Sequence, residues 1–352
     1  MIPSCSSAPQ GTWYSPYAAG HQVVNMGRVS AVVVALVVWS GCGDSTGPQD
    51  SPLVIDILDT TTEPPAKVTV TFQVSTEAGE PVPNLPVSAF ELFDNGVSDS
   101  QFESSKAFQP KPGRFQTSVA LLLDMSGSIT GSDALAPLKT AAGAFVDKSL
   151  EAEGVAVGVW WFDGGADIVE LMDFTTNGAA LNAAIDGLTA AVTRDNSTNL
   201  NGAIQLGIDV VEQRMQEGSV GGVTQAGALV IFTDGTDQAN RVPSAAALLS
   251  VQATSIAVYS IGLRGEIDET FLSRIGRSGS AFADNTASLL SEFTGVGNQI
   301  EAMANSFYVL AYCSPRRAGV ANQLTIRVTL GSRQASATTE YPAVNFTGGC
   351  TI

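Results

Sequence analysis

The feature that most constrains the fold is a regular alternation of apolar runs and stretches of helical periodicity over residues 117–305. The runs TSVALLLD (117–124), ALVIFT (228–233) and TSIAVYSIGL (254–263) are mostly apolar and do not alternate, which is typical of strands buried on both faces. Between them, TNLNGAIQLGIDVVEQRMQ (198–216) repeats apolar residues at helical spacing. This order predicts an α/β unit with a mostly parallel central sheet and helices on both faces.

The flanking segments have β character. Residues 67–75 alternate apolar and polar side chains, and the pair Asn95-Gly96 between apolar flanks is a turn signal. Residues 306–352 contain three short β-rich stretches that cannot cover themselves. We therefore predict that 306–352 pairs with a β-sandwich segment at 66–113, and that the α/β unit, residues 114–305, is inserted in or flanked by this small β-sandwich.

The amino-terminal region predicts export. Arg28 precedes the apolar run Ala31–Trp39, which is too short to span a bilayer but suits a signal peptide. Ser40 and Gly41 then lead to Cys42, an order that resembles a bacterial lipobox except that Trp39 stands where Leu is usual.

We expect residues 1–41 to be leader and signal peptide, with Met26 as the true start, and Cys42 to be lipidated. The alternative is an ordinary secretory signal. Residues 42–65, rich in Ser, Thr, Pro, Asp and Gly, are expected to form a flexible tether. The predicted location is the bacterial cell envelope, at the outer membrane or cell surface, with the membrane reached only through the lipid anchor.

Charge and composition exclude several classes of function. The formal net charge of −17 disfavours nucleic-acid binding. The one histidine, His21, lies in the predicted leader, so a processed chain has no imidazole for a Ser-His-Asp or Cys-His system. A phosphate-binding GxxxxGK[ST] loop does not occur, and Ser126 stands where an aspartyl phosphatase needs a second acid after Asp124. We interpret Asp163 and other acids near strand ends as ordinary surface carboxylates, and predict that the protein is not an enzyme.

The cysteines predict one disulfide. Cys5 and Cys42 belong to the leader region, which leaves Cys313 and Cys350 as the pair in the processed chain. No C-x-x-C occurs, which argues against a thiolate metal site or a dithiol redox centre.

Oxygen-bearing side chains follow three of the predicted elements. The first run ends in Asp124-Met125-Ser126-Gly127-Ser128, Thr198 opens the long helix, and ALVIFT is followed by Asp234. Ligands of parallel α/β sheets bind at the carboxyl ends of the strands, so these side chains are expected at one edge. A set of hard oxygens without sulfur or imidazole suits Mg²⁺, or alternatively Mn²⁺ or Ca²⁺.

The same residues carry a resemblance to a known family. The D-x-S-x-S motif, the later Thr198 and the later T-D-G are similar, in order and strand context, to the metal-ion-dependent adhesion site (MIDAS) of von Willebrand factor type A (vWA) domains, which have a Rossmann-like fold. The resemblance covers residues 117–305 and implies a MIDAS in which Ser126, Ser128 and Thr198 bind the metal directly. It implies that Asp124 and Asp234 act through water.

Two functions follow from this resemblance. The first is a metal-dependent, adhesion-like protein-binding module on the cell envelope, whose cation coordinates an Asp or Glu side chain of a partner protein. The alternative is a structural subunit of an envelope assembly, in which the metal only stabilises the fold or a fixed interface.

Overall fold

The structure is a computed structural model that describes residues 51–98, 106–109, 115–218, 223–348, 350 and 352. The predicted signal peptide, Met26 and Cys42 lie outside the described residues. Within the described part of the chain, no helix is both long and apolar enough to cross a membrane.

A six-stranded sheet forms the centre of the α/β unit, with strand order β11-β10-β9-β6-β7-β8. The strands are β6 (Phe115–Asp124), β7 (Val155–Phe162), β8 (Val169–Thr175), β9 (Thr224–Thr233), β10 (Ala257–Leu263) and β11 (Gly279–Ala283). Neighbouring strands run parallel except for β8, which is antiparallel to β7 at one edge. The prediction of a mostly parallel sheet is confirmed.

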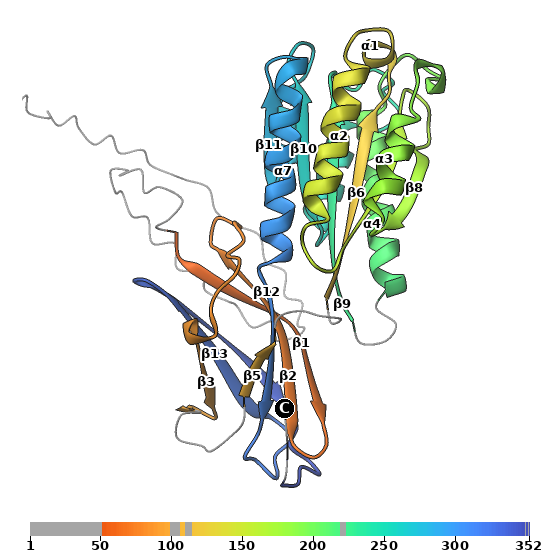
Figure 1. The fold of residues 1–352 in the computed structure, drawn as a ribbon. Helices are drawn as coiled ribbons and strands as arrows, with labels where there is room; N and C mark the ends of the chain where they lie inside the picture. The colour runs from red at the N-terminus through yellow and green to blue at the C-terminus, as the bar shows by residue number, and fades with distance from the viewer. Residues whose placement is uncertain (1–50, 99–105, 110–114, 219–222, 349, 351) are drawn as a thin grey trace, which may run out of the picture. The chain divides into compact units, whose positions relative to one another are not determined.

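Helices cover both faces of this sheet because its strands send alternate side chains to opposite sides. Val119, Leu121 and Leu123 of β6 share a core with α2 (Leu135–Ser149), α3 (Gly178–Asp186) and α7 (Leu289–Ala304). Ala120 and Leu122 share a second core with α4 (Leu200–Gly218), α5 (Ser244–Ala253) and α6 (Glu269–Ile275). Figure 1 shows α2 and α7 side by side along the sheet. Helix α3 was not among the elements expected from the sequence.

The flanking segments form two antiparallel four-stranded sheets around one apolar core, β1-β2-β12-β5 and β14-β13-β3-β4. The strands are β1 (Leu53–Glu63), β2 (Lys67–Thr76), β3 (Phe90–Asp94), β4 (Val97–Ser98), β5 (Lys106–Gln109), β12 (Phe307–Cys313), β13 (Asn322–Leu330) and β14 (Arg333–Tyr341). Strand β12 pairs with β2 and β5, and β13 pairs with β3. Along the chain, the whole α/β unit therefore lies between β5 and β12, which are neighbours in one sheet.

The expectation of a flexible tether over residues 42–65 is wrong for Leu53–Glu63, which forms strand β1, while residues 42–50 lie outside the described residues. Leu53–Glu63 pairs along its length with β2, and Leu53 and Ile55 are buried in the core shared by the two sheets. The physical reason is the alternation in LVIDILDTTTE, which places apolar side chains on one face, followed by three β-branched threonines. The Thr, Pro and Asp content of the whole segment concealed this strand.

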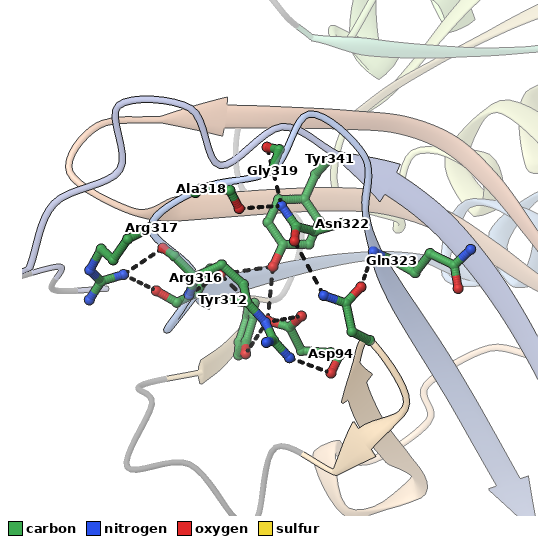
Figure 2. A network of polar contacts seen from close by, with 11 residues as sticks. Asp94, Tyr312, Arg316, Arg317, Ala318, Gly319, Asn322, Gln323 and Tyr341 are labelled. Atoms are coloured by element: carbon green, nitrogen blue, oxygen red, sulfur yellow. Dashed lines mark hydrogen bonds and ion pairs between the residues drawn. The ribbon is translucent and has the colours of Figure 1, made fainter.

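A buried carboxylate joins the two antiparallel sheets (Figure 2). Asp94, fully buried at the end of β3, accepts hydrogen bonds from the hydroxyls of Tyr312 at 3.1 Å and Tyr341 at 2.8 Å. Arg316 Nε donates to the same carboxylate at 3.0 Å. The predicted turn lies directly after Asp94 in the chain. Asn95 and Gly96 connect β3 to β4, and both have positive φ. Sequence reasoning identified the turn but not the ion pair beside it.

The structure also contains the disulfide between Cys313, the last residue of β12, and Cys350. The two cysteines are 37 residues apart, so the bond closes a loop that contains β13 and β14.

Candidate metal site

The predicted oxygen-bearing residues follow the carboxyl ends of adjacent strands. Strands β6 and β9 are parallel neighbours, so Asp124 at the end of β6 and Asp234 just after β9 emerge at the same edge. Thr198 precedes the first turn of α4, which packs on both strands. The topology of the sheet therefore brings three separate loops to one place.

The loop after β6 is ordered by its own polar groups. The backbone N–H of Ser126 donates to Asp124 Oδ1 at 2.9 Å, which turns the chain back across the end of the strand. Ser126 Oγ and Ser128 Oγ lie 3.2 Å apart, and Ser128 Oγ donates to Asp234 Oδ1 at 2.8 Å. Four of the five predicted residues thus form one continuous set of polar contacts.

Thr198 completes the group. A Cβ built on Gly235, the residue after Asp234, would lie 3.7 Å from Thr198 Oγ1. The carbonyl of Thr198 accepts from the N–H groups of Gln238 at 2.9 Å and Ala239 at 3.0 Å, which fixes the loop after β9 against the start of α4. All five predicted residues are therefore neighbours in the structure.

A glycine is required where two of these loops meet. The N–H of Gly127 donates to the carbonyl of Asn196 at 3.0 Å. A Cβ on Gly127 would lie 2.9 Å from the Cβ of Asn196, closer than such atoms come in proteins. The Gly between the two serines of the motif therefore permits the close approach of the loop that contains Thr198.

The two carboxyl groups lie in an unfavourable electrostatic environment. Burial, together with the negative charge of Asp234, raises the pKa of Asp124 to about 7, although the hydrogen bonds from Thr233 and Ser126 act to lower it. Burial also raises the pKa of Asp234, and the charge of Glu266 adds to that effect. Because desolvation disfavours the charged carboxylate, a positive charge between these groups would stabilise both.

Three interactions at or near the candidate site were not anticipated from the sequence. Thr233 Oγ1 donates to Asp124 Oδ2 at 2.6 Å and accepts from Gly235 N at 3.2 Å, so it holds the two strand ends together. Glu266 in the loop after β10 acts on Asp234 through its charge.

The interpretation of Asp163 as a surface carboxylate is wrong. Asp163 is buried, and its carboxylate accepts backbone hydrogen bonds from Gly165, Arg194 and Asp195. These bonds hold the loop before Thr198.

The donor set fits a hard divalent cation. It combines two carboxylates and three hydroxyls, which are the oxygens that Mg²⁺ and Mn²⁺ prefer. The pKa values of Asp124 and Asp234 are raised, so a positive charge nearby would stabilise their ionised forms. Among the described residues, no group of three or more His, Cys, Asp or Glu side chains could hold a metal ion. A metal site at this edge therefore depends on the serine and threonine hydroxyls.

Comparison with known proteins gives the following matches. The family described as von Willebrand factor type A domain matches residues 118–299, which is more than half of the 352-residue chain. A comparison with curated proteins finds no match.

Solved structures give further similarities at low sequence identity. A von Willebrand factor type A protein from Catenulispora acidiphila is 11% identical with a TM-score of 0.46, covering 84% of this chain and 74% of that one. Proximal thread matrix protein 1 from the mussel byssus, in a structure with a zinc-occupied MIDAS motif, is 17% identical with a TM-score of 0.44. That match covers 55% of this chain and half of the mussel chain. The von Willebrand factor domain of a type V pilus tip protein from Porphyromonas gingivalis is 14% identical with a TM-score of 0.41, covering 53% and 95%.

Proposed function

Because the chain belongs to the von Willebrand factor type A domain family, we propose that it is a metal-dependent protein-binding module and not an enzyme. Domains of this family are commonly protein-interaction modules that bind a divalent metal. The observation that carries the proposal is the convergence of Asp124, Ser126, Ser128, Thr198 and Asp234 at one edge of the central sheet. The bound partner is a protein that presents an Asp or Glu side chain.

The proposed role of each residue is the one implied by the resemblance to the MIDAS of this family. Ser126, Ser128 and Thr198 would bind the cation directly through neutral hydroxyls, while Asp124 and Asp234 would act through water. Neutral ligands leave much of the charge of the cation uncompensated, so a bound cation supplies an electrophilic position for an acidic side chain. Thr233 and the N–H of Ser126 orient Asp124, and Ser128 holds Asp234 in place. We propose Mg²⁺ as the metal, with Mn²⁺ and Ca²⁺ as alternatives.

We further propose that the protein acts at the bacterial cell envelope. This proposal rests on the amino-terminal sequence alone, in which Ser40 and Gly41 after the apolar run Ala31–Trp39 lead to Cys42. Lipidation of Cys42 would anchor the chain, and β1 begins at Leu53, so a connection of about ten residues would separate lipid and folded body.

Calorimetry with the full chain tests the metal site. Titration with Mg²⁺ or Mn²⁺ should detect one site per chain. Asp124→Ala and Thr198→Ala should each weaken binding at least about tenfold, because each removes a group from a small oxygen set. Thr140→Ala on α2 and Asp209→Asn on α4 are matched controls at exposed positions. Equal affinity in Asp124→Ala and in the controls would refute the site, and preference for Zn²⁺ would replace the proposed metal.

Capture of partners from envelope extracts, with and without chelator, tests the binding role. A reversible module should lose its partner when chelator is added and in Asp124→Ala. A partner that binds Asp124→Ala as well as the unaltered chain would contradict metal-dependent binding. It would favour the alternative, a structural subunit whose metal only stabilises the fold or a fixed interface.

A further inference from the structure

A cavity of about 510 Å³ opens beside the proposed metal site. It is bordered by Gly235, the neighbour of Asp234, and by Leu200, in the first turn of the helix that follows Thr198. Its volume is within the range of about 300–1,000 Å³ that is usual for ligand pockets. A partner that reaches the metal would therefore lie directly next to this cavity.

The wall of the cavity is apolar along much of its length. Leu200, Val242, Pro243, Phe271 and Leu272 line it, from the start of α4, the loop before α5 and the first turns of α6. Such a wall suits the methylene groups of a long side chain, which pack on apolar surface while the polar end remains hydrogen-bonded.

Besides Thr236, Asn240 and Ser244, whose side chains can donate hydrogen bonds, the polar lining of the cavity includes Asn201. Asn201 is 5% exposed, and its Nδ2 donates to the carbonyl of Val242 at 2.9 Å, which fixes the orientation of the amide. Among the described residues, no donor reaches the buried Asn201 Oδ1. A buried acceptor without a donor is unfavourable, so a donor that reached this oxygen would stabilise it; the atom has almost no accessible surface, so that contact requires a movement of the cavity wall.

Two carboxylates line the same cavity. Asp237 accepts from the backbone N–H groups of Asn201 and Asn240, both at 2.8 Å, which keeps its charge at the wall. Asp268 caps α6 by accepting from the N–H of Phe271 at 2.9 Å and is itself exposed. Both residues line the cavity.

The surroundings add negative charge. The negative charge of Glu266 acts on Asp234. Arg264, near these acids in sequence, forms ion pairs with Glu269 and Asp284. Arg241 donates to the carbonyl of Gly164 and pairs with Asp195. The negative charge of the carboxylates around the metal site and the cavity exceeds the positive charge of one divalent cation. An acidic partner therefore needs positive charge of its own to approach. The carboxylates are those of Asp124, Asp234, Glu266, Asp237 and Asp268.

We propose that this cavity receives a lysine or arginine side chain of the same partner whose acidic side chain reaches the metal. The inference rests on the proposed function and specifies the partner as a segment with an acidic and a basic residue close together. The methylene groups of the basic residue would pack along Val242 and Phe271. Its N–H groups would donate to the carboxylates of Asp268 and Asp237.

The cavity is tested first without the metal. N-acetyl-arginine amide and its neutral isostere N-acetyl-citrulline amide are titrated into the full chain carrying Asp124→Ala, and the methyl resonances of Val242 and Leu272 are followed by NMR. The arginine derivative should shift these resonances and bind at least about threefold more tightly than the citrulline derivative. Asp268→Asn, which keeps the helix cap, should remove that difference, and Asp209→Asn should leave it unchanged. Equal binding of the two compounds, or no shift at Val242 and Leu272, would overturn the inference.

Random peptides displayed on phage then test the coupling of cavity and metal. Peptides retained by the full chain in Mg²⁺ and released by chelator should combine an acidic residue with a nearby Lys or Arg. Selection against Asp268→Asn should weaken the basic preference and keep the acidic one. Chelator-sensitive peptides that carry only the acid would overturn this inference and leave the proposed function intact. Failure to select any chelator-sensitive peptide would overturn the proposed function, whatever the arginine titration shows.

Discussion

Replacement of Asp124 by asparagine should stabilise the metal-free protein at neutral and alkaline pH. The carboxyl group is fully buried, and Asp234 adds a second negative charge nearby. Asparagine keeps an oxygen that can accept from the N–H of Ser126, and its amide can donate to Thr233 Oγ1. The substitution therefore removes a buried charge without leaving the two neighbouring groups unpaired.

The magnitude follows from the pKa of Asp124, which is about 7 in the folded protein against the ordinary value of 3.8. Below pH 3.8 the carboxyl is protonated in both the folded and the unfolded chain, and its titration does not affect stability. As the pH rises, the unfolded chain ionises first, so the free energy of unfolding falls until the pH exceeds the folded pKa. The reduction is about 2 kcal/mol at pH 5 and about 4 kcal/mol at pH 8.

Urea denaturation in the presence of chelator measures the effect, at pH 5 and at pH 8. Other carboxylates titrate over the same range, so the informative quantity is the difference between the unaltered chain and Asp124→Asn. That difference should grow by about 2–3 kcal/mol in favour of Asp124→Asn between the two pH values. Asp209→Asn, which replaces an exposed acid on α4, controls for the loss of one charge.

Added Mg²⁺ should reverse the order. A metal that binds only the folded state raises the free energy of unfolding of the unaltered chain, and Asp124→Asn should not gain from it. If the unaltered chain and Asp124→Asn show the same pH dependence in chelator, the reasoning from the buried, uncompensated carboxylate is refuted.

Three further predictions concern other parts of the chain. Replacing Cys313 and Cys350 together by serine should lower the free energy of unfolding by about 3–4 kcal/mol, from the entropy of a 37-residue loop, measured by urea denaturation; an unchanged midpoint would contradict it. Asp94→Ala should cost about 3 kcal/mol, the lower end of the range for a broken buried ion pair because Arg316 is 31% exposed; a loss below about 1 kcal/mol would show the pair to be dispensable. Cys42→Ala should move the protein from the membrane fraction to the soluble fraction, and unchanged lipid labelling of this variant would refute the anchor.

The α/β unit could be predicted from the sequence because its signals are local and repeated. Mostly apolar runs such as residues 117–124 are buried on both faces, and α4 presents Leu200, Ile204, Ile208 and Val211 to one core. Strand β1 was missed because its alternation lies within a segment whose composition is typical of a linker. The segment becomes a strand through its pairing with β2 and the burial of Leu53 and Ile55, which are effects of the neighbouring chain.

The sequence by itself determined which oxygens are available at the candidate site. The ends of the strands and the spacing of the motif can be read from it, and the motif contains oxygen-bearing side chains without sulfur or imidazole. Only the tertiary structure decided how these groups act on one another. The burial and raised pKa of Asp124, the bond from Thr233 and the charge of Glu266 depend on strands and loops far apart in the chain. The cavity beside Asp234 likewise exists only where α4, α5 and α6 meet. Desolvation and electrostatic interaction are set by distance in space, and residue order specifies that distance only once the sheet has formed.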